Sequence, residues 1–348
     1  MVEKVFSREN NFCKNLVIVD GASGSGKSVI SPLLSCFENV EKFKVDYKYE
    51  NFCILNNKKN DFEDQIYLKT FADNDLYDSV IAREINTRFY DYTSIFQNNN
   101  WLNYLKRLFL KSDEKLIEYL INKKPYLNLQ THGILISGDI LFRTFQERLK
   151  MIVVMRHPVY LVEHWMSYNI DRYGQDPKQF QMALKFGESN FRPWYAESIE
   201  NYEELNYIEK IVSSIIEIYK KYFRKIETFG LVYSNQMMTI PFEDFVLYPD
   251  KYIKNISGLL GRNQKSIIHN FLKKHKCPRK NLLIGPTLGD YKNKKGDKKL
   301  YKNDIEEFNK KLEFIKKNIN PRLLNEFKFM IDKYRSAFTF EREMPWEK

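Results

Sequence analysis

Short apolar runs alternate along the chain with longer stretches of helical periodicity. We predict strands where such a run is closed by a polar or turn residue: Leu16–Val19, Phe43–Tyr47, Gly133–Ser137, Met151–Met155, and either Leu231–Tyr233 or Met237–Ile240. Apolar residues at spacings of three and four predict helices: Asn74–Phe89, Trp101–Leu110, Glu114–Ile121, Val159–Tyr168, Ser198–Phe229, Asn303–Lys317 and Pro321–Tyr334. Strands that alternate with helices predict a parallel sheet covered on both faces, a three-layer α/β/α fold.

The pattern predicts one domain over residues 1–348, because no segment has the composition of a linker. Asp61–Lys124 contains helical periodicity without a clear strand. We therefore expect a helical insertion there, at residues 61–124, which could cap a substrate.

Composition narrows the class of protein. Of the 348 residues, 43% are hydrophobic, enough for a full core. The four cysteines have neither disulfide-framework nor zinc-site spacing, so we expect a reducing compartment and no metal site. No apolar run approaches the roughly 20 residues of a membrane span, and Met1–Asn15 lacks the apolar core of a signal peptide, so we expect a cytoplasmic protein.

The formal net charge of +11 comes from lysines spread along the whole chain, most densely at Lys292–Lys299. Such a surface attracts anions in general. The sequence has no aromatic-plus-basic RNA signature and no DNA-reading pattern, so we expect a nucleotide as the anionic partner and no nucleic acid.

A glycine-rich segment follows the first predicted strand and precedes a helix, and it fits the phosphate-binding pattern G-x-x-x-x-G-K-[ST]. Its residues are Gly21, Ala22, Ser23, Gly24, Ser25, Gly26, Lys27 and Ser28. Glycines in such a loop let consecutive N–H groups point at phosphate oxygens, and the lysine neutralises charge. Ser28 would bind magnesium if the ligand were ATP.

The strand Met151–Met155, the corner Arg156-His157-Pro158 and the helix after it resemble the nucleotide-binding element of the sulfotransferase family. The resemblance implies 3′-phosphoadenosine 5′-phosphosulfate as the sulfuryl donor. In the family, the corner arginine and a serine eight positions later hold the 3′-phosphate. Arg156 matches the arginine, whereas His164 stands at the second position and Ser167 lies one helical turn further.

A later segment, Ile240–Phe245, also resembles the family, in which a Tyr-Glu-Asp-like turn precedes a helix ending in Leu-Gly. Phe242 replaces the tyrosine, and Leu260-Gly261 ends the helix. The family's basic loop has two candidates, Arg279-Lys280 and Lys292–Lys299. The phosphate-binding loop departs from the common family form, Pro-Lys-Ser-Gly-Thr-Thr, and is complete in the ATPase style.

Sulfuryl transfer needs a phosphate cradle, a cation and a base that takes the acceptor's proton. Lys27 supplies the cation. The resemblance implies a base near the end of an early strand, for which Glu50 is our first candidate and Asp46 the second. His132 and Asp139, which flank another predicted strand, are alternatives.

The sequence thus predicts a sulfotransferase that acts on a hydroxyl or amine of a small molecule or glycan. Trp165, Trp194 and Tyr195 are candidates for a stacking surface or for the core. Two other functions stay open at this point. One is an ATP-dependent kinase that uses magnesium, with Asp139 as a possible magnesium ligand, and the other is a nucleotide-binding module without catalysis.

Overall fold

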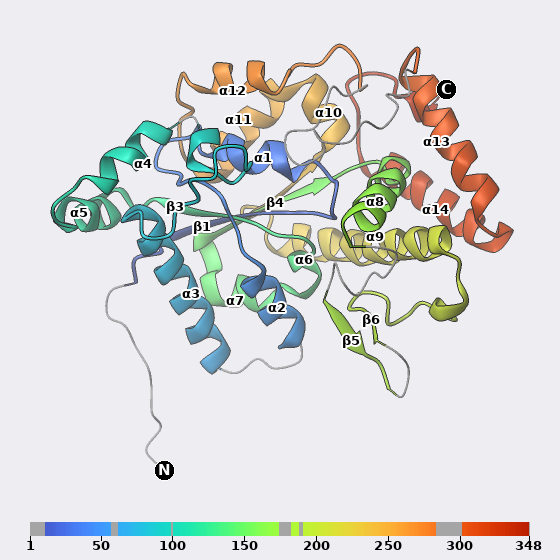
Figure 1. Ribbon diagram of the computed structural model, residues 1–348, viewed down its shortest axis with the longest axis horizontal. Coiled ribbons are helices and arrows are strands. Elements are labelled where there is room, and N and C mark those ends of the chain that lie inside the picture. Colours follow the sequence, from blue (N-terminus) through green and yellow to red (C-terminus); the bar gives the residue numbers. More distant parts are fainter. Residues whose placement is uncertain are drawn as a thin grey trace.

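Five parallel strands form the central sheet, in the order β2-β3-β1-β4-β7 (Figure 1). The computed structural model describes residues 11–56, 62–98, 100–173, 182–187, 191–282 and 301–347, with only the backbone for 167–173. The sheet strands are β1 (Asn15–Asp20), β2 (Lys44–Val45), β3 (Tyr126–Gln130), β4 (Leu149–Met155) and β7 (Met237–Pro241). A separate antiparallel pair consists of β5 (Ala183–Lys185) and β6 (Phe191–Pro193).

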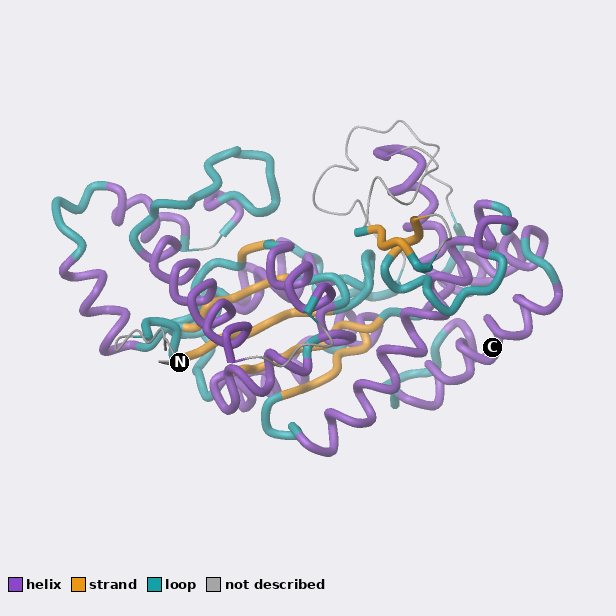
Figure 2. Tube along the Cα trace, turned by 90° about the horizontal axis from the view of Figure 1, so that it is seen from below, coloured by secondary structure: helices purple, strands orange, loops and turns teal. Residues whose placement is uncertain are grey.

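Helices cover both faces of this sheet, which gives the predicted three-layer α/β/α architecture (Figures 1 and 2). One layer contains α1 (Lys27–Leu34), α10 (Phe242–Leu247), α11 (Pro249–Leu260) and α12 (Ile268–Lys274). The opposite layer contains α2 (Tyr47–Leu55), α3 (Phe62–Val80), α6 (Ile134–Ser137), α7 (Asp139–Phe145) and α9 (Tyr207–Val232). Leu16, Val17, Ile18 and Val19 of β1 are fully buried, because β1 is central and lies between the two layers.

The remaining helices lie at the two ends of the sheet (Figure 1). At the β2 end these are the 3₁₀ turn η1 (Ile95–Gln97), α4 (Trp101–Leu108) and α5 (Glu114–Lys123). At the β7 end lie α8 (Pro158–Tyr173), α13 (Asp304–Asn318) and α14 (Pro321–Ala337). Both α13 and α14 pack on α8, and all three pack on α9. The other 3₁₀ turns are η2 (Gln146–Arg148), η4 (Tyr202–Glu204) and η6 (Pro345–Glu347).

The strand predicted at Gly133–Ser137 is wrong. Its apolar residues form the short helix α6, which begins after Gly133 at a φ of 114°, and the strand of this region is β3. The sequence of β3, Tyr-Leu-Asn-Leu-Gln, concealed it because two buried positions are polar. Asn128 Nδ2 donates to Ser31 O at 2.9 Å, so burial leaves this donor paired.

The helix predicted at Asn74–Phe89 lies earlier in the structure, as α3, and ends at Val80. Its buried stripe is Leu68, Ala72, Leu76 and Val80, at a spacing of four. Between β2 and β3 the described residues of 46–125 form helices and turns and no strand, and the assignment of 1–348 to one domain stays a prediction. None of the described helices has the length and apolar character to cross a membrane.

Candidate functional site

The segment from Gly21 to Ser28 joins the carboxyl end of β1 to the start of α1, where the sequence predicted a phosphate-binding loop. Gly24 and Gly26 have φ angles of 82° and 104°, which side-chain-bearing residues rarely adopt. A Cβ at Gly24 would lie 2.3 Å from the His164 ring, and one at Gly26 would lie 2.0 Å from the Phe242 ring. The loop therefore depends on glycine both for its backbone conformation and for the close approach of these two rings.

Lys27 is the cation of this loop and is only 3% exposed. Its Nζ donates to Gly21 O at 2.6 Å and to Ala22 O at 2.8 Å, so the side chain folds back over the loop. Burial lowers the pKa of Lys27 to about 8, although the charges of Asp20 and Glu50 act in the opposite direction. An anion in the loop would favour the protonated form and offer Nζ a charged partner.

The segment Arg156-His157-Pro158 after β4 and the helix α8 also contact the loop. Arg156 Nη1 donates to Gly24 O at 2.9 Å, and Trp165 Nε1 donates to Ser23 O at 2.9 Å. His164 packs against Gly24, so the position eight residues after Arg156 does reach the loop. Ser167 lies on α8, but its side chain is outside the described residues.

Arg156 also faces a small pocket beside the loop. The pocket is lined by Arg156, Tyr160, Phe242, Glu243, Val246, Arg279, Leu282 and Glu307. Within the described part of the chain, Arg156 Nε, Arg279 Nη1 and Tyr160 Oη are buried and make no hydrogen bond. Buried donors of this kind are costly unless a partner satisfies them, and two belong to guanidinium groups, so the pocket suits an anion.

Two carboxyl groups also line this pocket, and burial favours their uncharged form. Glu243 Oε1 lies 4.0 Å from Arg156 Nε, and it accepts a hydrogen bond from His157 N at 3.0 Å. Burial raises the pKa of Glu243, and it raises the pKa of Glu307 to about 7. Each group therefore carries a proton over a wider pH range than a surface carboxyl, which reduces its repulsion of an anion.

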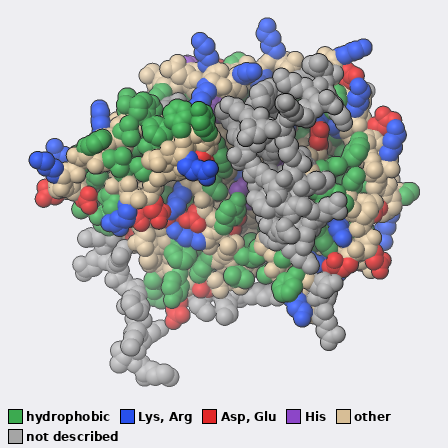
Figure 3. All heavy atoms as spheres, viewed as in Figure 1, with side chains coloured by type: hydrophobic (Ala, Val, Ile, Leu, Met, Phe, Trp, Pro, Cys, Tyr) green, Lys and Arg blue, Asp and Glu red, His purple; other side chains and the backbone are tan. Residues whose placement is uncertain are grey.

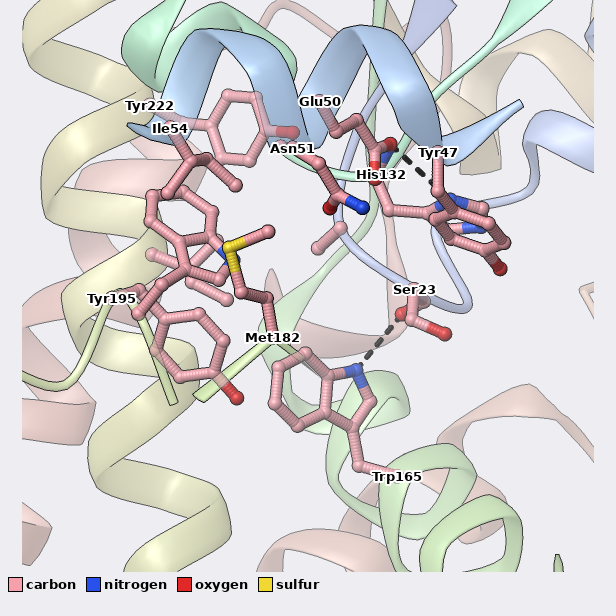
Figure 4. A pocket seen from close by; sticks show the side chains of 14 residues that line it. Ser23, Tyr47, Glu50, Asn51, Ile54, His132, Trp165, Met182, Tyr195 and Tyr222 are labelled. Atoms are coloured by element: carbon pink, nitrogen blue, oxygen red, sulfur yellow. Dashed lines mark hydrogen bonds and ion pairs between the residues drawn. The ribbon is translucent and has the colours of Figure 1, made fainter. Parts of the chain in front are cut away.

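A second, larger cavity opens beside Ala22 and Ser23 of the loop (Figure 4). About 670 Å³ in and around it is free of atoms, and part of this volume is open solvent. Its other lining residues come from α2, the turn after β3, α8, the β5–β6 pair with the residues that flank it, and α9: Tyr47, Glu50, Asn51, Ile54, His132, Gly133, Trp165, Met182, Trp194, Tyr195, Ile218 and Tyr222.

The polar side chains gather at one side of this cavity. Glu50 accepts a hydrogen bond from His132 N, and Glu50 Oε1 lies 3.5 Å from His132 Nδ1. Tyr47 stacks on the His132 ring at a centroid distance of 5.6 Å. In Figure 4, Glu50, His132 and Tyr47 lie together, while Ile54, Met182, Tyr195 and Tyr222 line the opposite, largely apolar side. The cavity therefore suits a molecule with one polar end and an apolar body.

The structure separates the other candidate bases from this cavity. Asp46 caps α2 by accepting from Lys48 N at 2.9 Å, and it forms ion pairs with Lys44 and Lys48. Asp139 begins α7 and forms an ion pair with Lys225. Among the described residues, no group of three or more His, Cys, Asp or Glu side chains is arranged to hold a metal ion.

The structure brings together the predicted loop, Arg156, His164, Glu50 and Trp165, and it adds lining residues that no motif indicated. Tyr222 and Ile218 lie within the long amphipathic helix α9, where the sequence pattern indicates only burial. Tyr160 carried a usable signal, because it lies four residues after Arg156 in the first turn of α8, and its ring centroid is 5.5 Å from the guanidinium carbon. The basic candidate Lys292–Lys299 is outside the described residues, whereas Arg279 lines the small pocket.

Replacing Gly26 by alanine should abolish anion binding by the loop. The new Cβ would overlap the Phe242 ring and force a left-handed backbone to carry a side chain. Sulfate affinity, measured by calorimetric titration, should fall at least about tenfold. Gly258→Ala is the matched control, since its Cβ meets no atom within 4 Å and the position is helical. Unchanged sulfate affinity in Gly26→Ala would contradict the prediction that Gly21–Ser28 binds an anion.

The lowered pKa of Lys27 predicts pH-dependent binding of a fully ionised anion. Lys27 attracts sulfate only when protonated, so affinity should fall as the pH rises through about 8. The limiting slope should approach about tenfold per pH unit. In Lys27→Met, affinity should be weak at neutral pH and this step should be absent, while exposed Lys254→Met should behave as the wild type. If sulfate affinity falls with pH in Lys27→Met as it does in the wild type, the titrating group is not Lys27.

Neither a family model nor a curated protein sequence matches this chain. Among the solved structures that are similar to it in fold are two sulfotransferase domains and one sulfotransferase. One, from the curacin biosynthetic pathway, has a TM-score of 0.45 and 11% identity, covering 94% of this chain and 98% of its own. Another, from the Synechococcus olefin synthase, has a TM-score of 0.42 and 12% identity, covering 97% and 100%. A Mycobacterium avium sulfotransferase has a TM-score of 0.42 and 11% identity, covering 95% and 79%.

Proposed function

We propose that this protein is a sulfotransferase that uses 3′-phosphoadenosine 5′-phosphosulfate and acts on a hydroxyl or amine of a small molecule. The observation that carries the proposal is the pocket of unpaired donors at Arg156, Arg279 and Tyr160, directly beside the phosphate-binding loop. ATP carries its phosphates in one chain, whereas this donor carries anionic groups on two sides of its ribose. Two neighbouring anion sites suit the second arrangement better.

The residues of the loop would hold the 5′ end of the donor, and those of the small pocket its 3′-phosphate. Arg156 connects the two sites, because Nη1 already binds the loop at Gly24 O while Nε faces the pocket. Lys27 would exchange its bonds to Gly21 O and Ala22 O for the 5′-phosphate and stabilise the charge that develops there.

The donor supplies a sulfuryl group, whose bond to the 5′-phosphate oxygen breaks as the acceptor oxygen or nitrogen bonds to sulfur. The acceptor proton must pass to the protein, and Glu50 with His132 lies at the polar side of the acceptor cavity. Trp194 and Tyr195 at the apolar side would hold the rest of the acceptor. This division supports a small molecule with an apolar body over a glycan, whose hydroxyl groups need polar partners all round.

Calorimetric titration with adenosine 3′,5′-bisphosphate, and separately with ATP and magnesium, tests the proposed donor at matched salt. We expect the bisphosphate to bind more tightly than ATP. Arg156→Ala should weaken the bisphosphate by about 10- to 100-fold, because a charged hydrogen-bonding group is lost. Arg322→Ala, at a position that is 81% exposed, should bind as the wild type.

The opposite preference has a definite meaning. Tight ATP binding with magnesium and weak binding of the bisphosphate would make the protein a kinase or an ATPase, which the complete loop and the exposed Ser28 would fit. Undiminished bisphosphate affinity in Arg156→Ala would show that Arg156 does not hold the 3′-phosphate.

Glu50 and His132 are proposed to take the proton from the acceptor. Substitution of either residue should reduce turnover without reducing nucleotide affinity. With a labelled sulfuryl donor and a panel of phenols, alcohols and amines, we expect Glu50→Gln and His132→Ala to lose about 10²- to 10⁴-fold in kcat. Asp46→Asn is the comparison, since asparagine also caps helices and should leave kcat within about threefold. A large loss in Asp46→Asn with full activity in Glu50→Gln would reverse the assignment.

A further inference from the structure

The charged side chains that line the small pocket cancel when all of them are ionised. Its walls contain two guanidinium groups, those of Arg156 and Arg279, and two carboxyl groups, those of Glu243 and Glu307. In Figure 3, acidic and basic side chains are interspersed over the described part of the visible face, and at physiological salt screening acts over about 8 Å. The charge state of the two carboxyl groups therefore decides how strongly the pocket attracts an anion.

The two carboxyl groups are held in different ways. Glu243 accepts hydrogen bonds from His157 N at 3.0 Å and from Tyr334 Oη at 2.8 Å, so the protein fixes its position. The Glu307 side chain accepts no hydrogen bond from any described residue. Within the described chain, the one cation inside 4 Å of it is Lys311, whose Nζ lies 3.4 Å from Glu307 Oε1. Glu307 is therefore the carboxyl group of the pocket that is left to interact with a ligand.

Helix α13, which runs alongside α8, places Glu307 where its charge is easily lost (Figure 1). The Glu307 side chain is 15% exposed, and its one cationic neighbour is shared, because Lys311 also forms an ion pair with Glu163. Burial raises the pKa of Glu307 to about 7, with Arg156 acting against this rise and Asp304 adding to it. Glu307 therefore changes its charge near neutral pH.

Several elements place charged or titratable groups around Glu307. Helix α13 also packs on η6, where Glu347 is exposed and accepts from Met344 N, and the Asn206 side chain before α9 contacts Asn318 at the far end of α13. Burial raises the pKa values of the neighbouring tyrosines, which stay neutral, so near neutral pH the charge of the pocket depends on its carboxyl groups. The neighbouring groups among the described residues are Arg156, Tyr160, Glu163, Glu243, Arg279, Tyr301, Asp304, Lys311, Tyr334 and, paired with Asp304, Arg342.

We propose that Glu307 couples binding of the donor's 3′-phosphate to a proton, because its carboxyl group is uncharged and donates a hydrogen bond when the phosphate occupies the small pocket. The inference rests on the proposed function, which assigns the 3′-phosphate to this pocket. The uncharged carboxyl leaves the two guanidinium groups in excess and adds a hydrogen-bond donor. The carboxylate would instead place a like charge beside the phosphate. Glu307 is thus a specificity-determining residue for the 3′ end of the donor, and the phosphate binds best below the pKa of Glu307 in the empty pocket.

Comparison of adenosine 3′,5′-bisphosphate with adenosine 5′-monophosphate isolates the small pocket, because both ligands share the 5′-phosphate and the titration of Lys27. In the wild type, the ratio of the two affinities should fall at least about tenfold between pH 7 and pH 9, as Glu307 ionises. The 3′-phosphate, with a pKa of about 6, keeps its charge over this range. In Glu307→Gln the ratio should change by less than about threefold, since the amide donates a hydrogen bond and does not ionise.

Proton uptake gives a second readout of the same coupling. Calorimetric titration at pH 8, in buffers of different ionisation enthalpy, should show that the wild type takes up about one more proton with the bisphosphate than with the monophosphate. This difference should disappear in Glu307→Gln. Glu313→Gln makes the same change on the same helix at a side chain that is 62% exposed, and it should behave as the wild type. Affinity for the monophosphate reports whether each variant is folded.

Failure of this inference differs from failure of the proposed function. An affinity ratio near one at both pH values in the wild type would show that the small pocket does not hold a 3′-phosphate, and would overturn both. A ratio well above one, with the same pH dependence and the same proton uptake in the wild type and Glu307→Gln, would leave the proposed donor site standing and overturn the role of Glu307. A high wild-type ratio that does not change with pH would have the same meaning.

Discussion

The buried carboxylate of Asp20, at the end of β1, is the interaction on which the arrangement of the site depends. It is fully buried and accepts hydrogen bonds from Thr131 Oγ1, from the N–H groups of Gly133, Ile134 and Leu135, and from Tyr222 Oη. One side chain thus accepts hydrogen bonds from the N–H groups at the start of α6 and connects this helix to β1 and α9. The next residue along the chain is Gly21, so the same group fixes the start of the phosphate-binding loop and, through the turn after β3, the place of His132.

The C-terminal helices contribute to the anion pocket through a second buried network. Glu243 accepts from His157 N and from Tyr334 Oη at 2.8 Å, and so connects α14 to the corner that carries Arg156. The His157 ring stacks on Trp346 at a centroid distance of 4.3 Å, and burial lowers its pKa well below the ordinary value. A neutral histidine in an aromatic cluster adds no charge near Arg156, so the guanidinium groups dominate the pocket. Residues beyond 300, which no motif covered, therefore complete the site from a distance in sequence.

Local sequence was informative where one segment determines its own conformation. The turn at Gly21–Ser28 between a strand and a helix was predicted correctly, because its glycines, its lysine and the flanking strand and helix are consecutive. Phosphate binding by this loop stays a prediction. Glu50 and Asp46 show the limit, since both follow the same strand and only the direction of α2 makes one line the cavity and the other cap the helix. The strand β3 and the role of Tyr222 were missed because each depends on partners far along the chain, Ser31 for Asn128 and Asp20 for Tyr222.

The periodicity of α4 illustrates the same limit for a surface. The spacing of its apolar residues predicted a helix at Trp101–Leu110, and the structure has one at Trp101–Leu108. A helix with this pattern is expected to pack with its apolar face inward. In the structure, Tyr104 and Arg107 face inward instead and bind Glu41. That carboxyl is buried, and Arg107 holds its pKa below the ordinary value against the opposing effect of burial. Rotating the helix would remove Tyr104 and Arg107 from this buried carboxylate and leave it only the hydrogen bond from Tyr119 Oη. The loss of its cationic partner is costly for a buried charge. The buried ion pair therefore fixes the rotation of α4 about its own axis, which leaves Trp101, Leu102 and Leu108 exposed.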